Sequence, residues 1–387
     1  MPWYYRAKAA INVAAPFLVP TQKTNLALLV SAILKKRTLC LSELARAYPT
    51  PQERRVAAPK HCLLHRLKRL WRFTNNERVD PLAVQLAFVP HTIARLGHPP
   101  LLGVAIDWTM FDATMPSGGK MRYQVLRVAV PRKGRALPLV QLAYDRDRLP
   151  PERSQNQIEQ DALLAVIEAL PKGVRPVVLA DRGFCRAGFL KWLECRNLDY
   201  VVRLAKGACI TEPDGKRWKL GEEGLRLGEL RFCGGVRYGL YHGRPRDLFV
   251  NVALCWRMPK GQKRRNPGCE EPAEPWYLAT SLQDAKSAAS WYRQRGWIEQ
   301  SFKDSKTRFG LARVQIRCPQ RLSRLLAGLT IALSWLSLMA LPGIGAMPRR
   351  WHAAVAQRGR ASITSLALAL LDHFGNLPLA CLPRLSR

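Results

Sequence analysis

The order of short apolar runs between residues 101 and 204 constrains the fold more than any other feature. Each run has the length and composition of a β-strand, and turn or helix signals separate the runs. The five expected strands are residues 101–107, 121–130, 137–143, 177–180 and 200–204. Helical patterns at residues 154–169 and 184–195 lie between the last three strands. The order βββαβαβ predicts an α/β fold, in which a mixed sheet is flanked by helices.

Two of these strands end in a carboxylate. Asp107 closes the first strand, and Asp181 directly follows the fourth. Because strands of such a sheet bring their ends to a common edge, we expect the two side chains to lie close together. An aspartate at a strand end is also a common turn former, so neither acid alone indicates catalysis.

A third carboxylate lies in a stretch without proline, residues 284–311, which predicts one continuous helix. On a regular helix, four polar residues share a face about 60° wide: Tyr292, Arg295, Glu299 and Lys306. An apolar stripe beside this face predicts that the helix packs on a core while the polar face lines a cleft. The alternative is that Glu299 belongs to an ordinary surface ladder with Arg295 and Lys303.

Asp107, Asp181 and Glu299 together offer only oxygen donors. Such hard ligands suit Mg²⁺ or Mn²⁺ rather than zinc. Two such ions can activate an attacking oxygen and stabilise the leaving oxygen of a phosphoryl transfer. The three acids therefore predict a site for metal-dependent chemistry on phosphate.

The charge of the chain indicates the partner. The 387 residues contain 62 Lys and Arg against 28 Asp and Glu, a formal net charge of +34. An excess of this size favours a polyanion such as DNA, although a basic protein of the membrane surface is an alternative. In the basic N-terminal region, residues 61–73 predict an amphipathic helix whose cationic face contacts DNA or is simply solvated. Its candidate DNA-binding residues are Arg66, Lys68 and Arg69.

The remaining segments complete the expected organisation. Glycine-rich, alternating residues 206–275 predict a β-rich insertion, after which residue 276 begins another strand. We expect a helical, DNA-binding region at residues 1–98 and a helical tail at residues 346–387. Between them, the insertion at residues 206–275 separates two core segments, residues 99–205 and 276–345. The uncharged residues 325–341 favour a buried helix over a membrane span. Ten scattered cysteines and the lack of a good signal peptide favour the cytoplasm.

The spacing Tyr292-x₂-Arg295-x₃-Glu299-x₆-Lys306 resembles the Tyr-Arg-Glu-Lys signature of bacterial insertion-sequence transposases of the DDE superfamily. The segments 104–109, 179–184, 200–204 and 276–280 are similar to motifs of the same family, so the resemblance covers about residues 60–340. It implies an RNase H-like core interrupted by a β-rich insertion. It also implies cut-and-paste transposition, in which the enzyme cleaves the ends of its own element, often through a hairpin, and joins them to a target.

The resemblance also implies roles for individual residues. Asp107, Asp181 and Glu299 would bind two Mg²⁺ ions, for which Mn²⁺ can substitute. The residues that would contact double-stranded DNA near the cleaved phosphate are Tyr292, Arg295, Lys306 and Arg182. Two element ends held together imply a homodimer on DNA, associated with the bacterial nucleoid.

One position departs from the family pattern. Relatives usually carry tryptophan directly after the signature arginine, where it stabilises a base turned out near the hairpin. Here Gly296 occupies that place and Trp297 follows. Either a distorted helix lets Trp297 contact the DNA, or another aromatic residue does so. A catalytically inactive DNA-binding relative and a different RNase H-like nuclease are the alternatives to a transposase.

Overall fold

The chain forms two compact units. The computed structural model describes residues 2–47, 61–114, 118–132, 134–241, 244–256 and 274–340. The first unit comprises Met1–Pro100, Asp107–Val174 and Trp297–Arg387, and the second comprises Leu101–Ile106 and Arg175–Gly296. The expected tail at residues 346–387 lies outside the described residues.

Ten strands form a mixed sheet in the order β3-β2-β1-β4-β5-β12-β11-β8-β6-β7. The strands of its first half are β1 (Leu101–Thr114), β2 (Lys120–Arg132), β3 (Arg135–Asp145), β4 (Arg175–Ala180) and β5 (Asp199–Arg203). β2 and β3 are antiparallel, whereas β4 is parallel to both β1 and β5. This arrangement confirms the predicted α/β class and is consistent with an RNase H-like core.

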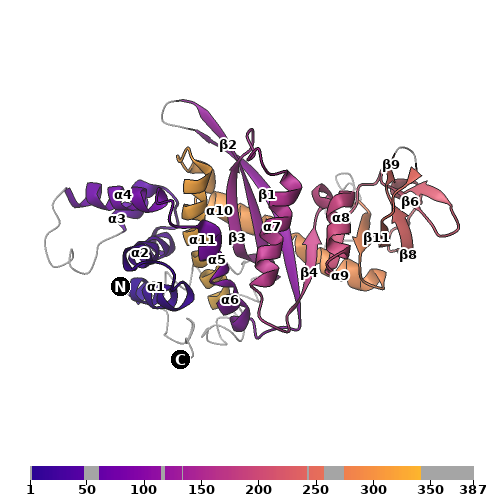
Figure 1. Ribbon diagram of the computed structural model, residues 1–387, viewed down its shortest axis with the longest axis horizontal. Helices are drawn as coiled ribbons and strands as arrows, with labels where there is room; N and C mark the ends of the chain where they lie inside the picture. Colours follow the sequence, from indigo (N-terminus) through magenta and orange to yellow (C-terminus); the bar gives the residue numbers. More distant parts are fainter. Residues whose placement is uncertain are drawn as a thin grey trace, which may run out of the picture. The chain divides into compact units, whose positions relative to one another are not determined.

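The helices of the first unit include six that precede β1. These are α1 (Pro2–Ala14), α2 (Pro20–Lys36), α3 (Leu41–Arg46), α4 (His61–Thr74), α5 (Pro81–Leu86) and α6 (Val89–Arg95). After β3 come α7 (Gln155–Glu168), α10 (Trp297–Thr307), the 3-10 turn η3 (Leu311–Arg313) and α11 (Pro319–Ala340). Ser154 and Gln157 form a capping box at the start of α7. Helices α5, α10 and α11 pack on β3, which is the edge strand of the sheet (Figure 1).

The second unit contains β4 and β5. The turn η1 (Arg182–Phe184) and α8 (Ala187–Glu194) connect β4 to β5. The expected β-rich segment follows, with β6 (Cys209–Thr211), β7 (Arg217–Lys219), η2 (Leu220–Glu222), β8 (Leu230–Tyr238), the hairpin β9 (Leu240–Tyr241) and β10 (Arg244–Pro245), and β11 (Phe249–Cys255). The unit ends with β12 (Trp276–Thr280) and α9 (Ala285–Arg295).

Strand β1 is longer than predicted, because it continues for seven residues beyond Asp107. The expectation that Asp107 ends its strand is therefore wrong. The alternation of side chains persists after the acid, with Thr109, Phe111 and Ala113 buried. Asp107, Thr109 and Asp112 interrupt the apolar residues of this segment, so a search for continuous apolar runs misses it.

The predicted continuous helix at residues 284–311 is also wrong, because the chain forms two helices that meet at Gly296. The N–H of Gly296 donates to Gln294 O, so it leaves the regular ladder of bonds to the fourth preceding residue. Glycine within a helix costs about 1 kcal/mol relative to alanine, which favours a break at this position. Tyr292 and Arg295 therefore belong to α9, whereas Glu299 and Lys306 belong to α10.

Helix α11 is the buried helix that residues 325–341 predicted. Leu325, Leu329 and Leu336 have no exposed surface. In the part of the chain that the structure describes, no helix is long and apolar enough to cross a bilayer.

Close packing of α11 on α2 leads to the first prediction. A Cβ atom on Gly328 would lie 2.7 Å from Leu29 Cδ2, so the two helices approach closely only because this position is glycine. We expect Gly328→Val to lower the free energy of unfolding by about 2 kcal/mol through overpacking, as measured by urea denaturation. Adding Leu29→Ala should make the double variant more stable than the sum of the two single effects. Additive losses would contradict this contact.

Candidate active site

A pocket of about 290 Å³ in the first unit contains two of the three predicted acids. Residues of β1 form one side of it, and residues of α10 form the other. The lining residues are Asp107, Trp108, Thr109, Glu299, Phe302, Lys303, Lys306 and Thr307. Asp107 is 7% exposed, whereas Glu299 is exposed to solvent. The structure thus brings together one acid from the sheet and one from the signature segment.

Trp108, the residue after Asp107, anchors this part of the strand. The backbone N–H of Trp108 donates to Asp107 Oδ1 at 2.9 Å. The indole Nε1 of Trp108 donates to Glu159 Oε1 of α7 at 2.6 Å. The Trp108 ring also packs edge-on against Tyr144, with the ring centroids 5.7 Å apart. The position of the Asp107 carboxylate therefore depends on helix α7 as well as on its own strand.

Helix α10 carries both Glu299 and Lys306. Its apolar residues Ile298 and Phe302 are buried and pack the helix on the core. Lys306 Nζ donates to the carbonyl oxygen of Met110 at 2.7 Å, which ties the amine to β1. Burial lowers the pKa of Lys306, and the nearby charge of Arg127 lowers it further.

Asp181 lies in the second unit, at the end of β4. It caps η1, because its Oδ1 accepts the N–H of Gly183 at 2.8 Å. A Cβ atom on residue 183 would lie 3.0 Å from the same oxygen, so glycine permits this close approach. The other oxygen, Oδ2, forms an ion pair with Arg295 Nη2 at 3.2 Å.

Tyr292 occupies a different environment from the one that the sequence predicted. It is buried rather than exposed on a polar face, and burial raises the pKa of its phenol. Its ring packs edge-on against Trp276 of β12, with the centroids 5.0 Å apart. Sequence reasoning did not single out Trp276, although the half-buried tryptophan opens one of the family-like segments.

The other predicted DNA-binding residues lie at varied depths. Arg182 and Lys68 are exposed, whereas Trp297, Arg66 and Arg69 are half-buried. On α4, Arg69 Nε donates to Asn25 Oδ1 of α2 at 2.7 Å, so this arginine also anchors the helix. Trp71 of the same helix is exposed, and the guanidinium of Arg321 from α11 lies over its ring at 4.9 Å. Arg321 thus adds a further cation beside α4.

The donor chemistry of the acids suits a hard divalent cation. Asp107 and Glu299 line one pocket and supply only carboxylate oxygens there. Within the described ranges, no group of three or more His, Cys, Asp and Glu side chains could hold a metal ion.

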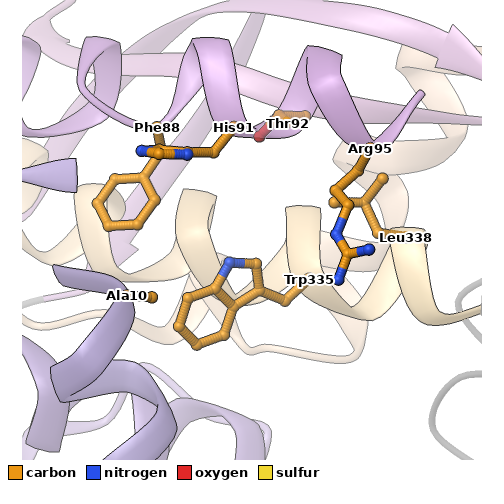
Figure 2. Close-up of a pocket in the computed structure, with 7 residues that line it drawn as sticks. All are labelled: Ala10, Phe88, His91, Thr92, Arg95, Trp335 and Leu338. Atoms are coloured by element: carbon orange, nitrogen blue, oxygen red, sulfur yellow. The ribbon is translucent and has the colours of Figure 1, made fainter. Parts of the chain in front are cut away.

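A second pocket lies in the first unit and differs in chemistry (Figure 2). Its volume is about 20 Å³, enough for one water molecule. It is lined by Ala10, Phe88, His91, Thr92, Arg95, Trp335 and Leu338. Burial lowers the pKa of His91, which favours its neutral form. The pocket contains no carboxylate, so it is not a candidate for metal-dependent chemistry.

Comparison with known proteins identifies the family of this chain. The family model described as a transposase DDE domain matches residues 98–335, a range that includes Asp107, Asp181 and Glu299. No protein with a curated description matches the sequence. Since the family match extends over more than half of the 387 residues, the chain belongs to the family of transposases that carry a DDE domain.

Proposed function

We propose that this transposase cuts its own insertion sequence out of double-stranded DNA and joins the ends to a target. Membership of the family implies an enzyme that acts on DNA, and the excision and joining steps are our proposal. The observation that carries it is the pocket in which Asp107, Glu299 and Lys306 line the same space. Two carboxylates beside a cation are suited to holding a phosphate together with its metal ions.

We assign the metal ligands to Asp107, Asp181 and Glu299, and the metal to two Mg²⁺ ions, with Mn²⁺ as a substitute. When bound, such ions polarise the scissile phosphate and lower the pKa of the attacking oxygen. The support from the structure is that the two acids in the first unit are oxygen donors of a single pocket.

Lys306 binds the DNA backbone in this proposal. An ammonium group has three N–H donors, and the bond to Met110 O accounts for one of them. The same amine can therefore also donate to a phosphate oxygen in the pocket. The bond to Met110 keeps it in place beforehand, which lowers the entropic cost of ordering a lysine side chain.

In the second unit, Arg295 orients the Asp181 carboxylate through their ion pair, in addition to any contact it makes with DNA. Its side chain is only 10% exposed, so a contact with DNA would use the outer edge of the guanidinium. Tyr292 supports this region from within, while the exposed Arg182 binds the backbone.

We assign recognition of the element ends to α4, whose exposed face carries Lys68 and Trp71. Holding two ends at once implies a homodimer in the DNA complex. The enzyme would act in the bacterial cytoplasm, where it associates with the nucleoid through DNA.

Removing the third acid tests the chemistry. We expect Glu299→Gln to reduce Mg²⁺-dependent cleavage of cognate ends to background, because the amide is a much poorer ligand for a divalent cation, while DNA binding is retained. Cleavage is read on denaturing gels, and binding by band shifts. Glu77→Gln, at an exposed acid elsewhere in the first unit, is the matched control. Cleavage retained by Glu299→Gln would exclude this residue as a ligand.

Neutralising α4 tests the docking of DNA. The variant Arg66→Gln/Lys68→Gln should weaken binding and flatten its dependence on salt, because each lost phosphate contact reduces the slope by about 0.9. Arg148→Gln/Lys172→Gln removes the same charge from exposed positions elsewhere and should leave the slope nearly unchanged. Arg69→Gln is measured separately, since its bond to Asn25 also supports the helix. If the two double variants have equal salt slopes, the cationic face of α4 is solvated and does not bind DNA.

A third test identifies the aromatic residue that supports a hairpin on the transposon end. We propose Trp276, because it lies against Tyr292 in the second unit, in preference to Trp297. Trp276→Ala should reduce the hairpin product relative to the initial nick, and Trp276→Phe should restore part of it through stacking. A hairpin yield that falls only in Trp297→Ala would assign the role to Trp297. Hairpin formation unaffected by either alanine would reject both.

A further inference from the structure

A fully buried charge of the first unit contacts Phe302, one of the residues that line the pocket. Arg127 of β2 has no exposed surface, yet its guanidinium reaches both the sheet and helix α10. Nη1 donates to Ser301 Oγ at 2.6 Å, and Nη2 donates to Ser305 Oγ at 2.8 Å. The Phe302 ring covers the guanidinium at 4.1 Å. Three residues of α10 within five positions therefore contact one side chain of the sheet.

The other side of the guanidinium is fixed by Gln141 of β3. Gln141 Oε1 accepts from Nε at 3.2 Å and from Nη2 at 2.5 Å. Gln141 is itself restrained, because its Nε2 donates to Thr330 Oγ1 of α11 at 2.8 Å and its backbone N–H donates to Gln85 Oε1 at 2.8 Å. Arg127 is thus held in one orientation by residues that have little freedom of their own.

We propose that Arg127 is a positioning residue for the active site: it sets the placement of α10, and hence of Glu299 and Lys306, relative to Asp107. The two serines lie about one turn apart, so bonds to both fix the helix along its axis and in rotation. Glu299 precedes Ser301 by two residues, and Lys306 directly follows Ser305. This inference rests on the proposed function, since it concerns the geometry of the metal-binding acids.

Packing alone does not explain why an arginine occupies position 127. A buried cation has a large desolvation cost, and apolar side chains of similar volume often stabilise a core as well or better. Burial lowers the pKa of Arg127 to about 9, while the carboxylates of Asp107 and Asp304 favour its charged form. The guanidinium therefore remains charged at neutral pH and supplies directional bonds that an apolar side chain cannot make.

The test measures metal binding and cleavage separately, in the full-length protein. Arg127→Lys removes the forked geometry, whereas Ser301→Ala/Ser305→Ala removes only the acceptors on α10 and leaves the arginine in place. Mn²⁺ binding is measured from the EPR signal of the free ion, and cleavage of cognate ends is measured as a function of Mn²⁺ concentration. We expect each variant to weaken Mn²⁺ binding about 10-fold and to raise the Mn²⁺ needed for half-maximal cleavage by a similar factor. Combining them should add little further loss.

Arg324→Lys is the matched control. Arg324 of α11 is also a buried arginine of the first unit, but it donates to Val79 O and Thr74 O, away from α10. This variant should lower the unfolding midpoint without changing Mn²⁺ binding. If Arg127→Lys and the serine variant lower only the unfolding midpoint, as the control does, Arg127 is structural and the inference is overturned.

Measurements on the wild-type protein distinguish a failure of the proposed function from a failure of the positioning role of Arg127. If it neither binds Mn²⁺ nor cleaves cognate ends, the proposed function fails. If it does both and the variants bind Mn²⁺ as tightly as the wild type, only the positioning role of Arg127 fails. Because serine to alanine favours a helix, the serine variant keeps the test decisive even if Arg127→Lys does not fold.

Discussion

A positive charge without access to water needs hydrogen-bond acceptors, and Arg127 finds them on two elements of the first unit. Gln141 of β3 accepts on one side, and the serines of α10 accept on the other. Losing the acceptors on either side would leave part of a buried guanidinium unsatisfied, at a cost of about 1–3 kcal/mol. The sheet and the helix that carries Glu299 are therefore joined by bonds that tolerate little displacement. Apolar contacts such as those of Ile298 and Phe302 hold the same helix down, but they do not specify its position as sharply.

Much of the fold was predictable because the core strands have conspicuous patterns. The order βββαβαβ, the capping box at Ser154 and the buried α11 follow from apolar runs and local polar signals. Of the three acids that the sequence predicts as metal ligands, two line one pocket. The role of Arg127 was not predictable. An arginine within an alternating strand is normally expected to face solvent. Here helix α10 buries it, and α10 comes much later in the sequence than β2.

The signature segment shows how a correct family assignment can accompany a wrong structural explanation. Tyr292, Arg295, Glu299 and Lys306 fit one face of an ideal helix, yet Gly296 divides them between α9 and α10. Each helix packs in its own environment: Tyr292 against Trp276, and α10 against Arg127. The spacing of these four residues therefore does not place them on one face of a single helix. Local patterns could not reveal the break, since a single glycine is often tolerated inside a helix.

The length of β1 has a consequence for how this protein can change in evolution. Asp107 lies inside the strand, so the direction of its carboxylate follows from the alternation of side chains between the two faces of the sheet. Substitutions at neighbouring positions leave that alternation intact. A one-residue insertion or deletion between Leu101 and Asp107 would instead turn the carboxylate toward the opposite face unless a bulge absorbed it. Length variation among active relatives should therefore be confined to the connections around this strand, while the strand itself varies only in composition.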